Sequence, residues 1–149
     1  MALIVEKIEN GTVIDHIPAG LGLKVLEILK IDKDYNARVA LVMNVISRKM
    51  GKKDIVKIEG KQIDEKTANK IALIAPNATM NIIKNSQIAE KTKVKLPNDL
   101  ISVFKCPNPQ CVTNMEQIET VFRLEKTEPI RKLRCGFCEM VFEAKELLV

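Results

Sequence analysis

The chain has 149 residues and a formal net charge of +5, and 46% of its residues are hydrophobic while only 3% are aromatic. This composition supports an aliphatic core but supplies few rings for stacking on bases, which argues against a nucleic-acid-binding function. Apolar runs such as residues 71–75 are far shorter than the about 20 residues that span a bilayer. Because no signal-peptide pattern opens the chain either, we expect a soluble, cytoplasmic protein with no membrane partner.

The first predicted elements are a strand and a helix. Residues 11–15, with the sequence GTVID, are typical of a short strand, and Pro18 suits the first turn of a following helix. That helix is predicted to bury one face, because four apolar residues follow helical spacing: Leu21, Val25, Ile28 and Leu29.

Two strands come next, at residues 38–43 and 55–58, separated by a polar turn at 47–51. A second helix follows, in which Asp64 is suited to the N-cap and Pro76 to the end. Its predicted apolar stripe consists of Ala68, Ile71, Ala72 and Ala75. Residues 79–84 and 86–91 complete the set as strands.

The order strand, helix, strand, strand, helix, strand is that of a ferredoxin-like α/β sandwich, an antiparallel sheet with two helices on one face. Residues 92–99 have the composition of a linker, and residues 121–124 and 130–134 are typical of short strands beyond it. We therefore predict an α+β protein with an N-terminal domain at 1–97 and a small all-β, zinc-binding domain at 98–149.

The second domain is predicted from four cysteines in two close pairs: Cys106 with Cys111, and Cys135 with Cys138. Pairs with this spacing present four thiolates to one tetrahedral Zn²⁺, and a fully occupied ligand set indicates a structural rather than a catalytic metal. The alternative is two disulfides, which require an oxidising compartment. The start of the chain does not favour that alternative.

The positive charge lies in the first part of the chain. Residues 1–100 carry 17 basic and 12 acidic residues, whereas residues 101–149 carry seven of each. No P-loop or dinucleotide fingerprint is present, so side chains would have to hold any phosphate. The candidates are Asp15, His16, Lys52, Lys53, Lys57, Lys84 and Lys91. The alternatives are that the lysines form a solvated strand face and that Asp15 caps the helix.

An enzyme is not expected from this set of residues. His16 is the only histidine, every cysteine is assigned to the metal, and no serine lies in a nucleophile elbow. A basic α+β domain joined to a zinc ribbon also fits a nucleic-acid-binding protein, but the 3% aromatic content supplies no stacking surface.

Several segments resemble the regulatory chain of aspartate carbamoyltransferase. They are GTVIDHIPAG at residues 11–20, MGKKD at 50–54, Ala75-Pro76 with Asn81, and the cysteine spacing, so that the resemblance covers essentially the whole chain. It implies a non-catalytic subunit of a pyrimidine-biosynthesis enzyme. In that family the N-domain binds CTP or ATP as allosteric effectors and pairs as a homodimer, and the zinc domain docks on the catalytic chain.

Matched by position, the resemblance implies a nucleotide site. Val5, Glu6 and Ile8 would surround the base, Asp15 and Lys57 the ribose, and His16 and Lys91 the phosphates, with Lys53, Asn81, Ile83 and Ile88 completing the site. The candidates for contact with the catalytic chain are Asn108, Gln110 and Glu139.

One departure from the family pattern concerns Ser86, which stands where the family has a tyrosine. Loss of that ring is expected to change the selectivity between CTP and ATP or to weaken both. A chain that keeps the architecture but has lost effector response, and so acts as a scaffold, is the remaining alternative.

Overall fold

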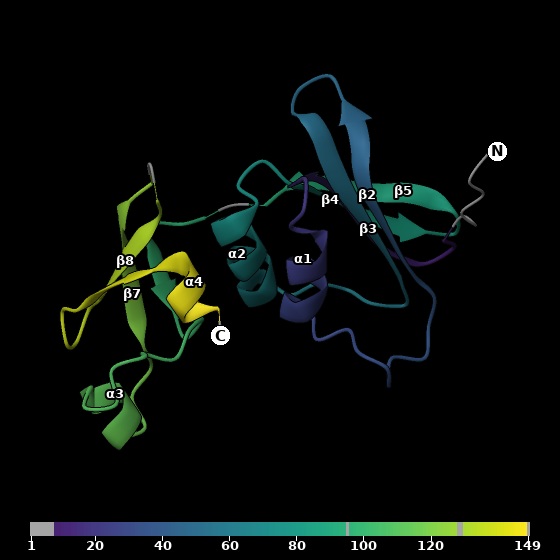
Figure 1. The fold of residues 1–149 in the computed structure, drawn as a ribbon. Coiled ribbons are helices and arrows are strands. Elements are labelled where there is room, and N and C mark those ends of the chain that lie inside the picture. Colours follow the sequence, from purple (N-terminus) through teal and green to yellow (C-terminus); the bar gives the residue numbers. More distant parts are fainter. Residues whose placement is uncertain (1–7, 95, 128–129, 149) are drawn as a thin grey trace.

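The computed structural model describes residues 8–94, 96–127 and 130–148. An N-terminal α+β part and a smaller C-terminal part lie side by side (Figure 1). The N-terminal sheet contains β1 (Gly11–Pro18), β2 (Val39–Ser47), β3 (Gly51–Glu59), β4 (Thr79–Lys84) and β5 (Gln87–Lys93). All its neighbouring strands are antiparallel, in the order β2-β3-β1-β4-β5. The predicted ferredoxin-like arrangement is confirmed, with β5 added beside β4.

Two helices, α1 (Gly22–Ile28) and α2 (Glu65–Ile74), cover one face of this sheet. Alternate residues of β3 show why: Asp54, Val56 and Ile58 are fully buried, whereas Lys53 and Lys57, which alternate with them, are half-buried. Successive side chains of a strand point to opposite faces, so β3 packs one side under the helices and turns Lys53 and Lys57 to the other. The core is aliphatic, as predicted, and comprises Ile14, Ile17, Val25, Leu29, Val56, Ile58, Ile71, Ala72, Ala75, Ala78 and Val94.

The start of α1 differs from the prediction, because β1 continues through Pro18 and the helix begins only at Gly22. The buried carboxylate of Asp54, on β3, accepts hydrogen bonds from the backbone N–H groups of Gly20 and Gly22, both at 2.9 Å. A Cβ atom at Gly22 would lie 2.5 Å from Leu41 Cδ1 and 2.9 Å from Asp54 Oδ2, so glycine lets these side chains approach without being displaced. A distant residue thus sets the helix start, which local signals placed too early.

The connection between the two parts is shorter than the predicted linker. Thr92 and Lys93 pair with β4, and Val94 is buried and donates a hydrogen bond to the carbonyl of Ala78 at 3.1 Å. Leu96 packs against both hydrophobic cores. Most of the predicted linker therefore belongs to packed structure.

The C-terminal part contains a second antiparallel sheet in the order β6-β7-β8-β9, formed by β6 (Asp99–Ile101), β7 (Val121–Lys126), β8 (Lys132–Cys135) and β9 (Val141–Glu143). Two single-turn helices, α3 (Val112–Met115) and α4 (Ala144–Leu147), accompany it. Phe122 lies edge-on to Phe104 and Phe142, with ring centroids 6.0 Å and 6.3 Å away. These rings give a small module a compact core.

The two parts also touch through α2. Leu73 is only 1% exposed and packs in the C-terminal core, although its helix otherwise faces the N-terminal core. Arg131 Nη1 donates a hydrogen bond to the carbonyl of Leu73 at 2.7 Å. Helix α2 therefore contributes to both cores. Within the described ranges, none of the helices has the length and apolar character needed to cross a membrane.

Candidate functional site

The face of the N-terminal sheet that the helices leave uncovered carries most of the predicted nucleotide-site residues. Val13 on β1 lies opposite Lys57 on β3 and Asn81 on β4, and Asn81 lies opposite Lys91 on β5. Residues directly opposite in antiparallel strands point to the same face. Because Ile14, next to Val13, is buried under the helices, this row points away from them.

A second row on the same face is apolar. Ile83 on β4 lies opposite Gly11 on one side and Ile88 on the other. The register of β4 and β5 shifts between Ile82 and Ile83, which lets Ile88 and Lys91, three residues apart, share one face. Ile88 is 62% exposed, so an apolar surface remains available beside the lysines.

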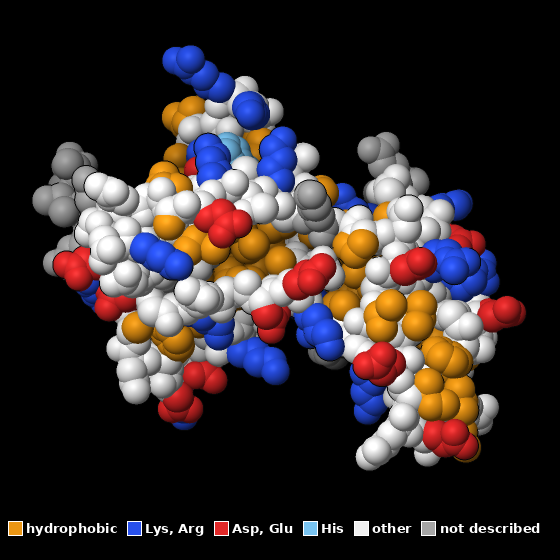
Figure 2. Space-filling model, turned by 180° about the vertical axis from the view of Figure 1, so that it is seen from behind, with side chains coloured by type: hydrophobic (Ala, Val, Ile, Leu, Met, Phe, Trp, Pro, Cys, Tyr) orange, Lys and Arg blue, Asp and Glu red, His pale blue; other side chains and the backbone are white. Residues whose placement is uncertain are grey.

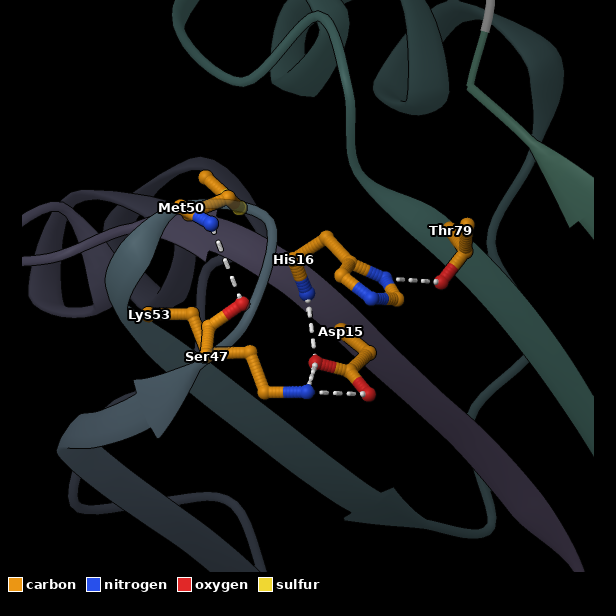
Figure 3. Close-up of polar contacts among 6 residues, drawn as sticks. All are labelled: Asp15, His16, Ser47, Met50, Lys53 and Thr79. Atoms are coloured by element: carbon orange, nitrogen blue, oxygen red, sulfur yellow. Dashed lines mark hydrogen bonds and ion pairs between the residues drawn. The ribbon is translucent and has the colours of Figure 1, made fainter.

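The third group surrounds a distortion of β1 at His16, whose φ is 61° and where the pairing with β3 shifts (Figure 3). Lys53 Nζ lies 3.0 Å and 3.2 Å from the two carboxylate oxygens of Asp15. The Nδ1 atom of His16 lies 3.1 Å from the hydroxyl of Thr79. The bulge thus turns His16 toward β4 while Asp15 holds a lysine from β3.

Asn81 has an unsatisfied polar atom. Its Oδ1 is buried and accepts no hydrogen bond from the part of the chain that the structure describes. An unpaired buried acceptor costs about 1–3 kcal/mol. A ligand that donates a hydrogen bond here would remove that cost. Ile8 is buried just before β1, and the remaining two predicted residues, Val5 and Glu6, lie outside the described residues.

The structure also brings in residues that sequence reasoning did not select. A cavity of about 180 Å³ is lined by His16, Lys49, Met50, Asn77, Thr79 and Lys93. Lys93 lies opposite Thr79 and, two residues from Lys91, points to the same face. The spacing of Lys91 and Lys93 in the sequence could have indicated that both lie on this face. Lys49 is brought to the cavity only by the β2–β3 hairpin. Figure 2 shows the single histidine between basic side chains.

The four cysteines converge as predicted. Their sulfur atoms all lie within 4.8 Å of one another, with Cys106 to Cys138 at 3.7 Å and Cys111 to Cys135 at 3.8 Å. A tetrahedral Zn²⁺ with bonds of about 2.3 Å requires sulfurs about 3.8 Å apart. The donor set therefore fits a structural zinc ion, and these four side chains would hold it.

The surroundings of the sulfurs affect their ionisation. Burial raises the pKa of the Cys106 and Cys135 thiols. Burial also acts to raise the pKa of Cys111, but hydrogen bonds from the hydroxyl and backbone of Thr113, together with neighbouring thiols, lower it to about 7. Metal binding needs thiolates, so the contacts that lower the pKa of Cys111 favour it as a ligand.

The predicted partner-contact residues lie around this cluster. Asn108 shapes the first cysteine loop, because its side chain accepts a hydrogen bond from the Gln110 backbone at 3.1 Å and its carbonyl accepts one from Cys111 N at 3.1 Å. Gln110 and Glu139 are exposed. Apolar side chains are exposed beside both cysteine pairs: Val112, Met115, Phe137, Met140 and Val141.

Comparison with known proteins matches both parts of the chain. Residues 3–95 match the family described as aspartate carbamoyltransferase regulatory chain, allosteric domain. Residues 98–148 match the corresponding metal binding domain. The aspartate carbamoyltransferase regulatory chain of Pyrococcus abyssi is 52% identical over 147 residues, covering 98% of this chain and 96% of that protein.

Two further relatives agree with this. The regulatory chain of Saccharolobus solfataricus is 52% identical over 147 residues, covering 98% of this chain and 92% of that protein. That of Thermococcus gammatolerans is 49% identical over 146 residues, covering 98% and 96%. This chain therefore belongs to the family of aspartate carbamoyltransferase regulatory chains, as its motifs predicted, and is a regulatory rather than a catalytic chain.

Proposed function

We propose that this chain senses CTP and ATP on the uncovered face of its N-terminal sheet and passes the signal to a catalytic chain docked on its zinc module. The observation that carries the proposal is the convergence of basic, polar and apolar side chains from four strands on that one face. The unpaired Oδ1 of Asn81 supports it further, because a nucleotide supplies the hydrogen-bond donors that this buried atom lacks.

The chemistry of each position suggests its role. Ile83 and Ile88 form an apolar wall suited to a base, and Asn81 Oδ1 accepts from an exocyclic amino group or a ribose hydroxyl. Asp15, with Lys57 nearby, accepts from ribose hydroxyls, while His16 and Lys91 meet the phosphates. Lys53 is paired with Asp15 at 3.0 Å, so a phosphate must compete with that carboxylate for it.

Ser86 bears on selectivity. It lies in the two-residue turn between β4 and β5, with a φ of 64°, and its N–H donates to the carbonyl of Glu9 at 2.9 Å. Its short side chain supplies no ring near Ile83 and Ile88. We expect the base to be held mainly by those two isoleucines, and CTP and ATP to be discriminated less strongly than with an aromatic contact.

The C-terminal module is proposed to bind one Zn²⁺ and to dock on the catalytic chain through the exposed side chains around the metal. Gln110 and Glu139 are the proposed polar contacts, with Asn108 holding the loop that presents Gln110. The exposed apolar side chains beside the cysteines add the hydrophobic area that such an interface needs. The assembly is proposed to be cytoplasmic, with regulatory chains paired through their N-domains.

Calorimetric titration of the zinc-loaded chain with CTP and then ATP tests the nucleotide proposal. Saturable binding is expected, and Lys57→Ala should weaken it strongly. Lys52→Ala is the matched control, because it removes the same charge from β3 one residue from Lys53, on the other side of the strand. If neither nucleotide bound, either to the chain alone or to its complex with the catalytic chain, the nucleotide proposal would be wrong. The chain would then be a scaffold without effector response.

A further inference from the structure

Two residues that follow Cys111 contact the metal-binding loop without being ligands. Asn114 Nδ2 donates hydrogen bonds to the carbonyls of Cys106 at 2.8 Å and Asn108 at 2.7 Å. The hydroxyl of Thr113 lies 3.2 Å from Cys111 Sγ. Asn114 therefore closes the loop between the first two cysteines, and Thr113 contacts the sulfur atom of Cys111.

The contact of Thr113 has a fixed direction once a metal is bound. A metal-bound cysteine is a thiolate without a proton, so the hydroxyl must donate to the sulfur. Four thiolates and one Zn²⁺ leave two excess negative charges in a mostly buried cluster. A donor aimed at a sulfur stabilises that charge. The backbone N–H of Phe137 makes a longer contact of this kind with Cys135, at 3.5 Å.

Asn114 acts on geometry instead. Its amide bridges two carbonyls six and eight residues earlier in the chain, and Asn108 also accepts from Cys111 N at 3.1 Å. These bonds fix the loop that separates Cys106 from Cys111. Without them the loop loses contacts that offset the entropic cost of ordering it around the metal.

We propose that Thr113 and Asn114 are positioning residues of the metal centre: Thr113 stabilises the Cys111 thiolate by hydrogen bonding, and Asn114 holds the loop that presents Cys106 and Cys111. The two act by different routes. Loss of the Thr113 hydroxyl changes the electronic environment of a sulfur, whereas loss of the Asn114 amide changes only the order of the loop. Loss of a hydrogen bond that orients or stabilises a metal ligand typically lowers metal affinity about 10- to 100-fold.

The test uses the full chain with Thr113→Val, which keeps the shape and removes the donor, and Thr113→Ser, which keeps the donor. Zinc affinity is measured by competition with a chromophoric chelator, and Co²⁺ is substituted to record the sulfur-to-metal charge-transfer band. Thr113→Val should lower the zinc affinity about 10-fold or more and shift the band to lower energy. Thr113→Ser should keep both the affinity and the band energy of the unsubstituted chain.

Thr120→Val is the matched control for Thr113→Val, because the Thr120 hydroxyl donates to the carbonyl of Phe104 in the same module, not to a sulfur. It should leave the cobalt band unchanged even where it lowers stability. An unchanged band and unchanged zinc affinity in Thr113→Val would overturn the role of Thr113. A band shift of equal size in Thr120→Val would also overturn it, by showing a general effect of destabilisation.

Asn114→Ala tests the second role. It should weaken zinc about 10-fold or more while leaving the charge-transfer energy in place, and hydrogen exchange of the loop amides in the zinc-loaded chain should become faster. Unchanged affinity would show that the loop is formed without this side chain. Because zinc affinity includes the folding of the module, a variant that is unfolded without metal still gives a measurable value.

Discussion

Single side chains decide what the uncovered sheet face is able to bind. Lys91 lies opposite Asn81 in the register, and no ion pair involving it is recorded among the described residues, whereas Lys53 is already paired with Asp15. A lysine with no carboxylate partner is the better phosphate ligand, because its charge is not offset before the ligand arrives.

We therefore predict that Lys91→Ala weakens the binding of CTP and ATP by about 10- to 100-fold, the loss expected for one charged hydrogen bond. Binding of the corresponding nucleosides should change little, since they carry no phosphate. Calorimetry with both ligands measures the difference, and Lys84→Ala on the neighbouring strand removes the same charge from the opposite face as a control. Equal losses for nucleotide and nucleoside would mean that Lys91 does not face the phosphates.

Individual elements differ in how far local sequence predicted them. Helix α2 was predicted almost to the residue, because its N-cap, apolar stripe and terminal proline are all local signals. Helix α1 was placed too early, because the carboxylate of Asp54, which comes from β3, holds its first turn. The bulges at His16 and between Ile82 and Ile83 were not predicted, because they depend on pairing between strands.

Helix α2 gives a prediction that depends on pH. Asp64 accepts a hydrogen bond from the Thr67 backbone at 2.7 Å, and the hydrogen bonds from Thr67 lower the pKa of this carboxyl. A carboxyl with a lowered folded-state pKa stabilises the fold above its unfolded pKa of about 3.9 and loses this contribution as the pH falls through the folded value. Asp64→Ala should therefore cost about 1 kcal/mol at pH 7 and less in acid.

Urea unfolding at pH 7 and at about pH 3, below the ordinary aspartate pKa, measures this cost. The exposed Asp99, whose ion pair with Arg123 lies at the surface, provides the control substitution Asp99→Ala. A cost for Asp64→Ala that stayed the same at both pH values would show that the ionised cap does not contribute.

At the scale of the whole molecule, α2 joins two separately built cores. The N-terminal core is formed mainly by residues of β1, β3, α1 and α2. Among the described residues, the buried C-terminal core includes three of the cysteines and, from the N-terminal sandwich, only Leu73. The cores depend on different stabilising interactions, and Leu73 with Arg131, together with Leu96, provides contacts through which a change in one core reaches the other.

We predict that removal of zinc by a chelator unfolds the C-terminal module and abolishes assembly with catalytic chains, while nucleotide binding is largely kept. A structural zinc contributes about 10–16 kcal/mol to such a module, whereas none of the four clustered cysteines is among the described residues of the N-terminal core. Circular dichroism measures the unfolding, mixing with catalytic chains measures the assembly, and calorimetry measures the nucleotide binding. Chelator-treated chain that still assembled would show that docking does not need the folded module.

The sequence by itself determined the fold class, the cluster of four cysteines and the family, because each depends on local spacing or on motifs that are contiguous in the chain. Two cysteines a few residues apart can present both sulfurs to one metal through local geometry, and the element order already predicts the sandwich. Only the tertiary structure decided which side chains share a face of the sheet. For example, the register shift between β4 and β5 brings Ile88 and Lys91 to the same face. It alone also showed that Lys53 pairs with Asp15 and that α2 packs into both cores, since these contacts join residues far apart in the chain.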